Sequence, residues 1–183
     1  MKRNVFAVLG FAMLLTACPE PQSAAPSADE VIRQALNLSL KAAHYRVTAE
    51  VFSNATGKTT SYTIEHQRPD RYHVFIPNGP EVIVIAEKIW GHDESGWKPL
   101  GKANPDPRTM LNILEPGIVV GFVKEQRNTG RNCDAYGLTD GKTQISVCVE
   151  ATGLMTYLEY ADDSGALTQF YDYKAAINIV PPI

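Results

Sequence analysis

A change of hydrophobic period near residue 44 divides the chain into a helical segment and a long alternating segment. Before this point, apolar residues recur three or four positions apart along one side: Val31, Ile32, Ala35, Leu36, Leu38 and Ala42. Just ahead of them, Ser27 to Glu30 fit a capping box, in which serine and glutamate side chains bind the free backbone N–H groups of the first turn. The pattern predicts an amphipathic helix over residues 28–43 with one apolar face.

From Tyr45 onward apolar and polar residues alternate, as in strands that have one face in water. Turn formers such as Pro69-Asp70 separate the alternating runs. The expected strands cover residues 45–51, 60–66, 71–76, 82–85, 89–92, 97–100, 156–161 and 166–174, with two more beside a turn at 140–141. Residues 82–85 are apolar at every position, which predicts a central strand buried on both faces.

A second, short helix is predicted over residues 107–114. Asp106 caps it, Pro107 occupies its first position, and Pro116-Gly117 ends it. Residues 118–123 fit either an extension of this helix or a strand, because periodicity does not separate the two on so short an apolar run.

The ratio of strands to helices indicates the fold class. About ten strands and two helices predict an α+β fold, with a curved antiparallel sheet whose concave face the helices cover. Ten strands about 4.8 Å apart span roughly 48 Å, and two helices, each about 10 Å wide, cover less than half of that width. The rest of the apolar face must curl on itself, meet a partner, or keep a hollow open for an apolar ligand.

The N-terminus has the pattern of a secretory signal. Lys2 and Arg3 precede an uncharged apolar run over residues 5–15, which is too short to cross a bilayer as a helix. The run ends in Leu15-Thr16-Ala17-Cys18, which resembles the lipobox of bacterial lipoproteins. The resemblance implies cleavage between Ala17 and Cys18 and attachment of acyl chains, palmitate among them, to Cys18. An ordinary signal peptide followed by a chance cysteine is the alternative.

These features divide the chain into a signal peptide (1–17), a lipidated cysteine with a flexible tether (18–26) and one domain (27–183). The net charge is −3, and loss of Lys2 and Arg3 makes the mature chain more negative. This charge argues against nucleic acid and against a basic membrane patch, and a multiply acylated Cys18 needs no such patch to hold the domain at a membrane. Pro19 stands where the inner-membrane retention signal would be Asp, so the resemblance implies an outer-membrane lipoprotein facing the periplasm.

Two cysteines remain for the folded domain. Cys133 and Cys148 would lie in an oxidising compartment, which predicts a disulfide between them. The segment between them contains Asp140-Gly141, a strong hairpin signal. With these two residues at the tip, in a four-residue loop closed by Leu138 and Thr143, the two cysteines lie directly opposite each other. A reduced pair that binds a metal is the alternative, which the absence of a CxxC motif disfavours.

The sequence carries no convincing catalytic motif. Gly57-Lys58-Thr59 echoes the end of a phosphate-binding loop, but the first glycine of that loop and its following helix are missing. With Pro69-Asp70 at a hairpin tip, His66 faces His73, and the pair supplies only two of the usual four ligands of a metal. A plain polar pair is the alternative. We expect no enzymatic activity, no catalytic residue, no cofactor and no bound metal.

Several segments carry a family resemblance. They are the leading amphipathic helix, the Pro-Asp break in HQRPDRYHVFI, the Trp90 and Trp97-Lys98-Pro99-Leu100 segments, and the terminal CVEATGLMTYLEYADDSGALTQFYDY. Together they resemble the LolA/LolB-like superfamily of bacterial envelope carriers, and the lipid-anchored members are the nearer analogy because this chain has its own lipobox. The resemblance implies a half-barrel closed by helices, in whose hollow several members bind acyl chains or lipoproteins.

The function that follows is non-catalytic binding or transfer of a lipid or another apolar ligand. The alternative is an envelope interaction module that docks a protein partner through its sheet. The candidate ligand-lining residues are Val47, Tyr62, Ile64, Val84, Leu111, Tyr160 and Phe170. Five aromatic residues crowd the last predicted hairpin and would either line the hollow or pack the core, of which packing is the commoner role: Tyr157, Tyr160, Phe170, Tyr171 and Tyr173.

Overall fold

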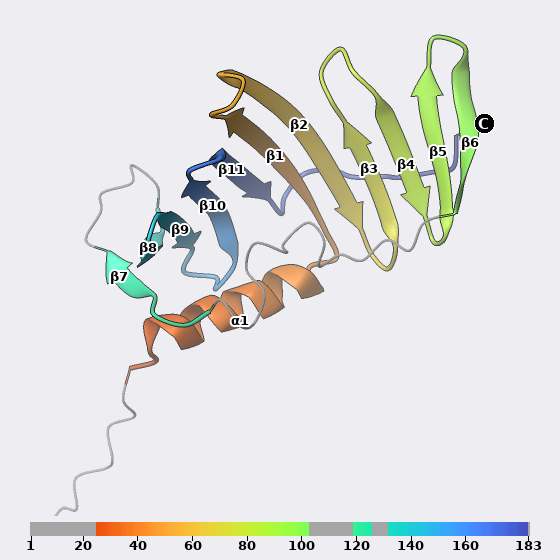
Figure 1. The fold of residues 1–183 in the computed structure, drawn as a ribbon. Coiled ribbons are helices and arrows are strands. Elements are labelled where there is room, and N and C mark those ends of the chain that lie inside the picture. Colours follow the sequence, from red (N-terminus) through yellow and green to blue (C-terminus); the bar gives the residue numbers. More distant parts are fainter. Residues whose placement is uncertain (1–24, 103–118, 126–131, 183) are drawn as a thin grey trace, which may run out of the picture.

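The computed structural model describes residues 25–102, 119–125 and 132–182, and these form one helix and one eleven-stranded antiparallel sheet. The elements are α1 (Ala28–Lys41), β1 (His44–Ser53), β2 (Lys58–Gln67), β3 (Arg71–Phe75), β4 (Glu81–Ile85), β5 (Lys88–Asp93), β6 (Gly96–Lys102), β7 (Val123–Glu125), β8 (Asp134–Asp140), β9 (Thr143–Val149), β10 (Met155–Asp162) and β11 (Gly165–Asp172). The strand order is β6-β5-β4-β3-β2-β1-β11-β10-β9-β8-β7, and β6 and β7 do not pair (Figure 1). The predicted α+β fold with a curved, open half-barrel sheet is confirmed.

Several predicted features fall outside the described residues. These are the signal peptide, Cys18, the short helix over 107–114 and the candidate residue Leu111. Within the described ranges, no helix combines the length and the apolar character that a membrane crossing requires.

Helix α1 begins at the predicted cap. The Ser27 side chain accepts a hydrogen bond from the Glu30 backbone N–H at 3.2 Å. The Glu30 carboxylate binds Arg33 and Gln34 one turn further on, so its side chain does not complete the capping box. Asp29 and Glu30 in the first turn and Lys41 in the last have the charges that the helix dipole favours at each end.

The buried face of α1 differs from the predicted one. The residues it buries are Ile32, Ala35, Leu36 and Ser39, whereas Leu38 is 46% exposed. Ser39 is buried because its Oγ accepts the Met155 N–H at 3.3 Å and hydrogen-bonds the Tyr173 hydroxyl at 2.8 Å. The packed face of α1 thus includes a polar residue. The prediction relied on apolar periodicity alone and therefore placed Leu38 on this face.

The long strand β1 is the middle of the sheet in space. It pairs with β2 over ten residues on one side and with β11 on the other, so the two ends of the domain meet there. Its alternation of buried Tyr45, Val47 and Ala49 with more exposed polar residues places the core on one face. We call this the inner face, because α1 packs on it against β7, β9 and β10.

Two predictions about strands need correction or extension. Residues 82–85 were expected to form a central strand, but β4 is third from the β6 edge, and of its residues only Ile83 is buried. Its continuous apolar run therefore does not indicate a central position. For residues 118–123, helix and strand were both expected alternatives; the described residues 119–122 form neither, and strand β7 begins only at Val123.

The predicted register of the β2–β3 hairpin is wrong by one residue. Gln67 pairs with Arg71, so the turn spans residues 68–70 instead of having two residues at its tip. His66 therefore faces Tyr72, and His73 faces Glu65. Because side chains alternate between faces, this shift places His66 and His73 on opposite faces of the sheet, and the predicted histidine pair does not form.

The disulfide between Cys133 and Cys148 is present, with Cα atoms 5.7 Å apart, but the predicted hairpin register is wrong. Asp140 pairs with Thr143 across a two-residue turn at Gly141-Lys142, where Gly141 has a φ of 59°. Cys148 therefore pairs with Ala135, and Cys133 lies just before β8 begins. The disulfide therefore joins β9 to the segment that leads into the neighbouring strand, β8.

The two faces of the sheet are covered by different segments. On the inner face, Asp29 of α1 accepts the backbone N–H groups of Gly121 and Phe122 at 3.2 and 2.8 Å, which ties the segment before β7 to the helix. The C-terminal segment crosses the sheet from β11 toward β6 (Figure 1). Its residue Ile179 is buried and bonds through its backbone to Gln67 and Arg71, which lie on the outer face.

Candidate functional site

Two rows of side chains cross the inner face from β1 to β5. Strand pairing places the first row in the order Tyr45, His66, Tyr72, Val84 and Ile89. The second row, next to it, is Val47, Ile64, Val74, Val82 and Gly91. Each row combines residues from five strands, so strand pairing builds a continuous surface that no single segment of sequence contains.

Burial decreases along both rows from β1 toward β5. Tyr45, His66 and Tyr72 are buried in the first row, whereas Val84 and Ile89 are only half-buried. In the second row, Val47 on β1 and Ile64 on β2 are buried, and the residues on β3–β5 are half-buried. Figure 1 shows β3–β6 extending beyond the end of α1, so in the described part of the chain no helix lies over this half of the inner face.

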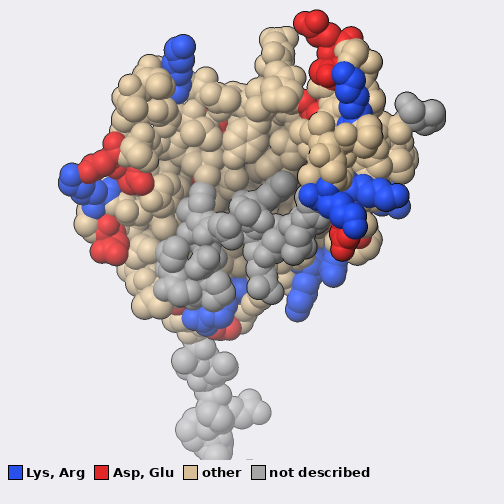
Figure 2. Space-filling view, turned by 45° about the vertical axis from the view of Figure 1, so that its right-hand side comes forward, with Lys and Arg blue, Asp and Glu red and all other residues tan. Residues whose placement is uncertain are grey.

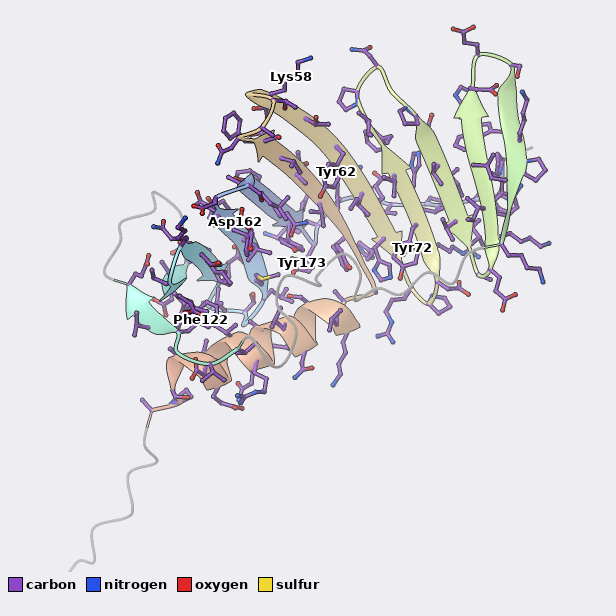
Figure 3. The ribbon with its side chains drawn as sticks, in the orientation of Figure 1. Lys58, Tyr62, Tyr72, Phe122, Asp162 and Tyr173 are labelled. Atoms are coloured by element: carbon purple, nitrogen blue, oxygen red, sulfur yellow. A yellow bond between two sulfur atoms is a disulfide. The ribbon has the colours of Figure 1, made fainter. Side chains whose placement is uncertain are left out.

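The covered end of the first row is an aromatic cluster. The ring centroids of Tyr45 and His66 are 4.8 Å apart, and those of His66 and Tyr72 are 4.9 Å apart. Tyr171 and Tyr173 adjoin Tyr45 at 6.2 and 5.9 Å. Figure 3 shows Tyr72 and Tyr173 toward the end of the sheet near α1, with Tyr62 farther along β2.

Two hydroxyl groups of this cluster have hydrogen-bond partners within the protein. Tyr173 hydrogen-bonds Ser39 and the Met155 carbonyl oxygen at 2.8 and 2.7 Å, and Tyr171 donates to the Gln169 side chain at 2.8 Å. Burial raises the pKa of Tyr173 and that of Tyr171 well above the usual value of a tyrosine hydroxyl. These hydroxyls are therefore neutral structural groups.

Three polar atoms, on Tyr45 and His66, have no hydrogen-bond partner among the residues that the structure describes. They are the Tyr45 hydroxyl and both ring nitrogens of His66, whose side chains are 2% and 1% exposed. A buried polar group without a partner costs about 1–3 kcal/mol of stability. A polar partner from outside the protein chain would remove that cost.

Burial also fixes the charge of these two side chains. It lowers the pKa of His66 to about 4, with a contribution from nearby Arg68, and it raises the pKa of Tyr45 to about 12. Both are neutral at pH 7. Neutral imidazole has one donor and one acceptor, and the tyrosine hydroxyl can do both, so the pair is suited to an uncharged polar partner.

The inner face brings together most of the predicted ligand-lining residues. Val47 and Ile64 are buried and part of the core, and Val84 is half-buried on the open half. Tyr62 and Tyr160 are half-buried on the same face, where Tyr62 is hydrogen-bonded with Gln169 and Tyr160 donates to Asp162 at 2.8 Å. These five residues therefore share the inner face, on strands β1, β2, β4 and β10.

Phe170 lies on the other face. It pairs with Thr48 and Tyr157, its ring centroid is 5.3 Å from that of Tyr157, and it is 37% exposed. A ligand on the inner face does not reach it, so we remove Phe170 from the candidate set. The terminal aromatics are thus divided, with Tyr160, Tyr171 and Tyr173 inside and Tyr157 and Phe170 outside.

Sequence reasoning missed the pairing that defines the polar end of the site. It considered His66 only beside His73, and Tyr45 only as a strand residue. The alternation did place Tyr45 and His66 on apolar faces of their strands, but their contact depends on the register of β1 with β2.

The outer face carries a ladder of charged side chains across β1–β5. Arg46 binds Glu65 at 2.6 Å, and His73 lies 3.4 Å from Glu65 and 2.7 Å from Glu81. His92 follows, 3.8 Å from Glu81. Within the described ranges, no three His, Cys, Asp or Glu residues are arranged to hold a metal ion.

A cavity of about 290 Å³ lies beside β7–β10. Its lining is largely polar, and the residues are Glu125, Leu138, Thr139, Gln144, Ile145, Ser146, Glu159 and Ala161. It does not overlap the two rows and does not suit an apolar ligand. Figure 2 shows uncharged residues across the upper middle of this face, with charged side chains toward its left and right margins.

Comparisons with known proteins identify the fold. No protein-family model matches the chain, and no curated protein matches its sequence. Among solved structures, the mycobacterial lipoprotein LppX from Mycobacterium tuberculosis is similar at 11% identity and a TM-score of 0.58, covering 83% of this chain and 97% of LppX. LprF from Mycobacterium bovis is similar at 11% identity and a TM-score of 0.56, covering 84% and 96%. At this level of identity the comparisons show that the chain shares the fold of LppX and LprF.

Proposed function

We propose that this chain binds a lipid or another apolar ligand on the inner face of its half-barrel and catalyses no reaction. The observation that supports this is the pair of side-chain rows, which continue as half-buried Val74, Val82, Val84 and Ile89 beyond the end of α1. Burial of such aliphatic surface stabilises a complex by about 25 cal/mol per Å². The shared fold with LppX, a lipoprotein, is consistent with this function.

The proposal places the protein in the bacterial envelope. The lipobox-like Leu15-Thr16-Ala17-Cys18 supports a lipid anchor on Cys18, and Pro19 favours the outer membrane with the domain facing the periplasm. The Cys133–Cys148 disulfide is consistent with an oxidising compartment. Labelling with a radioactive fatty acid should mark the wild-type protein and leave a Cys18→Ser variant unlabelled.

Ligand uptake tests the binding function. Native mass spectrometry of the full chain carrying Cys18→Ser should show a copurifying lipid, and the protein should take up a fluorescent fatty acid. A Val84→Lys variant should lose at least about fivefold in affinity, because a buried charge in an apolar site is costly. The matched control is Ile85→Lys, the next residue of β4, which points to the outer face and should bind as wild type does. Absence of both copurifying lipid and uptake would exclude the proposal.

A second candidate function is docking of an envelope protein along a sheet edge. Each edge strand exposes an apolar side chain, since Leu100 on β6 and Val123 on β7 are both 63% exposed. Unpaired edge strands can add a strand from a partner. Crosslinking in intact cells that recovers one protein partner in high yield from a lipid-free domain would favour this function over ligand binding.

A further inference from the structure

We propose that Tyr45 and His66 bind the uncharged polar group, a hydroxyl or an ester, of an acyl ligand whose chain lies along the first row toward β5. This inference rests on the proposed function and deepens it by naming the ligand class. Its basis is the juxtaposition of three unpartnered polar atoms with an apolar row that leads away from them.

The unpartnered atoms form one binding group. Tyr45 and His66 are directly paired across β1 and β2, and their rings are in contact at 4.8 Å between centroids. The hydroxyl groups of the neighbouring Tyr171 and Tyr173 form hydrogen bonds with other groups of the protein. The unpartnered atoms of Tyr45 and His66 therefore lie on two adjacent side chains, on the row that leads toward β5.

The chemistry of the pair selects an uncharged oxygen group. Neutral His66 donates one hydrogen bond and accepts another, and Tyr45 offers a hydroxyl, which match a ligand hydroxyl or the carbonyl oxygen of an ester. A carboxylate placed here would be a buried charge facing a neutral imidazole. The nearby cation, Arg68, is exposed and donates to the Lys41 carbonyl oxygen at 2.9 Å, outside this pair.

The direction of the acyl chain follows from the row. Beyond His66 come Tyr72, Val84 and Ile89, on β3, β4 and β5, so the row changes from polar aromatic to aliphatic. Three strand spacings separate His66 from Ile89, about 14 Å. An acyl chain along this path contacts the half-buried aliphatic residues, while its polar end lies beside Tyr45 and His66.

Competition among chain-matched ligands tests the proposal. The full chain carrying Cys18→Ser, with its disulfide formed, is loaded with a fluorescent fatty-acid probe, and the probe is displaced with monooleoylglycerol, methyl oleate, oleate or 1-octadecene. Wild type should bind the glyceride and the methyl ester about five- to tenfold more tightly than octadecene, the gain of one hydrogen bond. Tyr45→Phe and His66→Phe should reduce this preference to within about twofold, with octadecene affinity unchanged.

Tyr173→Phe is the matched control. It also removes one buried hydroxyl, but this hydroxyl has partners in the protein, so the variant should keep the ligand preference and lose thermal stability. Ligand-free Tyr45→Phe should be at least as stable as wild type, because it removes an unpartnered group.

The outcomes separate this inference from the proposed function. If octadecene binds wild type as tightly as methyl oleate, or if oleate binds more tightly than its ester through His66, the inference is wrong while the binding function stands. Equal loss of stability in Tyr45→Phe and Tyr173→Phe would also overturn it, since Tyr45 would then have a partner in the protein. If none of the four ligands displaces the probe and the probe itself does not bind, the proposed function fails.

Discussion

The two halves of the sheet cover their inner faces differently. Under α1, residues such as Val147, Met155 and Leu158 are at most 1% exposed and pack against the helix. In the half formed by β3–β6, aliphatic residues of the same kind are half-buried, and the helix has ended. The same alternating sequence pattern thus produces a closed core in one half and an open apolar surface in the other.

The two halves therefore contribute to different properties. The half under α1 stabilises the fold, and the half formed by β3–β6 serves the proposed binding of a ligand. A closed core stabilises the fold through burial, whereas an open apolar face retains free energy that a ligand can still gain. The aromatic cluster of Tyr45, His66 and Tyr72 lies where the two halves meet. It is closed to solvent like the core, and we propose its residues Tyr45 and His66 as the polar end of the binding site.

The largest expected contrast is between two truncations. Leu158→Ala, in the covered half, should lower the free energy of unfolding by about 2–5 kcal/mol, since it leaves a cavity in a closed core. Val84→Ala should cost under about 1.5 kcal/mol, because its side chain is half-buried. Chemical denaturation measures the free energy of unfolding of each variant. Equal losses would show that the β3–β6 half is as closed as the other.

Removal of the disulfide should have the next largest effect. The bridge closes a loop with a sequence separation of 15 within the covered half. The double variant Cys133→Ser with Cys148→Ser should lose about 3 kcal/mol, the loss expected for a loop of this size. The fluorescent-probe affinity of the folded protein should remain within about twofold of wild type, because the bridge lies in the half away from β3–β5. A loss of affinity as large as the loss of stability would contradict the division into halves.

A smaller effect is expected from pH at the boundary between the halves. His66 has a pKa of about 4 in the folded protein and an ordinary value of 6.5, because burial disfavours its charged form. The unfolded chain therefore binds the proton first, so stability is complete above pH 6.5 and decreases as pH falls toward 4. The total loss should be at most about 3 kcal/mol.

Unfolding measured from pH 7 to pH 4 checks this expectation. His66→Phe should flatten the decrease, and the control His44→Gln, which changes an exposed histidine, should not. An unchanged slope in His66→Phe would show that His66 is not the titrating group.

Local sequence patterns were sufficient for most of the fold. Ser27 predicted the start of α1, and alternation predicted every strand from β1 to β6 and the terminal hairpins, within a few residues. Such signals are reliable because they arise from capping and from the period of the backbone, which depend only on neighbouring residues. The α+β fold class followed from them, whereas the half-barrel was what the family resemblance implied.

Register was the part that local patterns did not fix. One extra turn residue after Gln67 moved His73 to the outer face, and a turn at Gly141-Lys142 moved Cys148 opposite Ala135. Phe170 was chosen for its aromatic ring without a predicted strand partner, and its pairing with Thr48 of β1 places it on the outer face. A side-chain period of two means that any shift by one residue exchanges the two faces, so small errors in turn length became complete errors in the site.

The sequence by itself determined most of the described elements and the pairing of Cys133 with Cys148, while the lipid anchor on Cys18 stays a prediction. Only the tertiary structure decided that α1 covers one half of the inner face and that Tyr45 meets His66 there. The physical reason is distance along the chain. Capping and alternation act between neighbouring residues. The cover of the inner face by α1 and the contact of Tyr45 with His66 depend on elements that are separated in sequence and become adjacent only in the folded sheet.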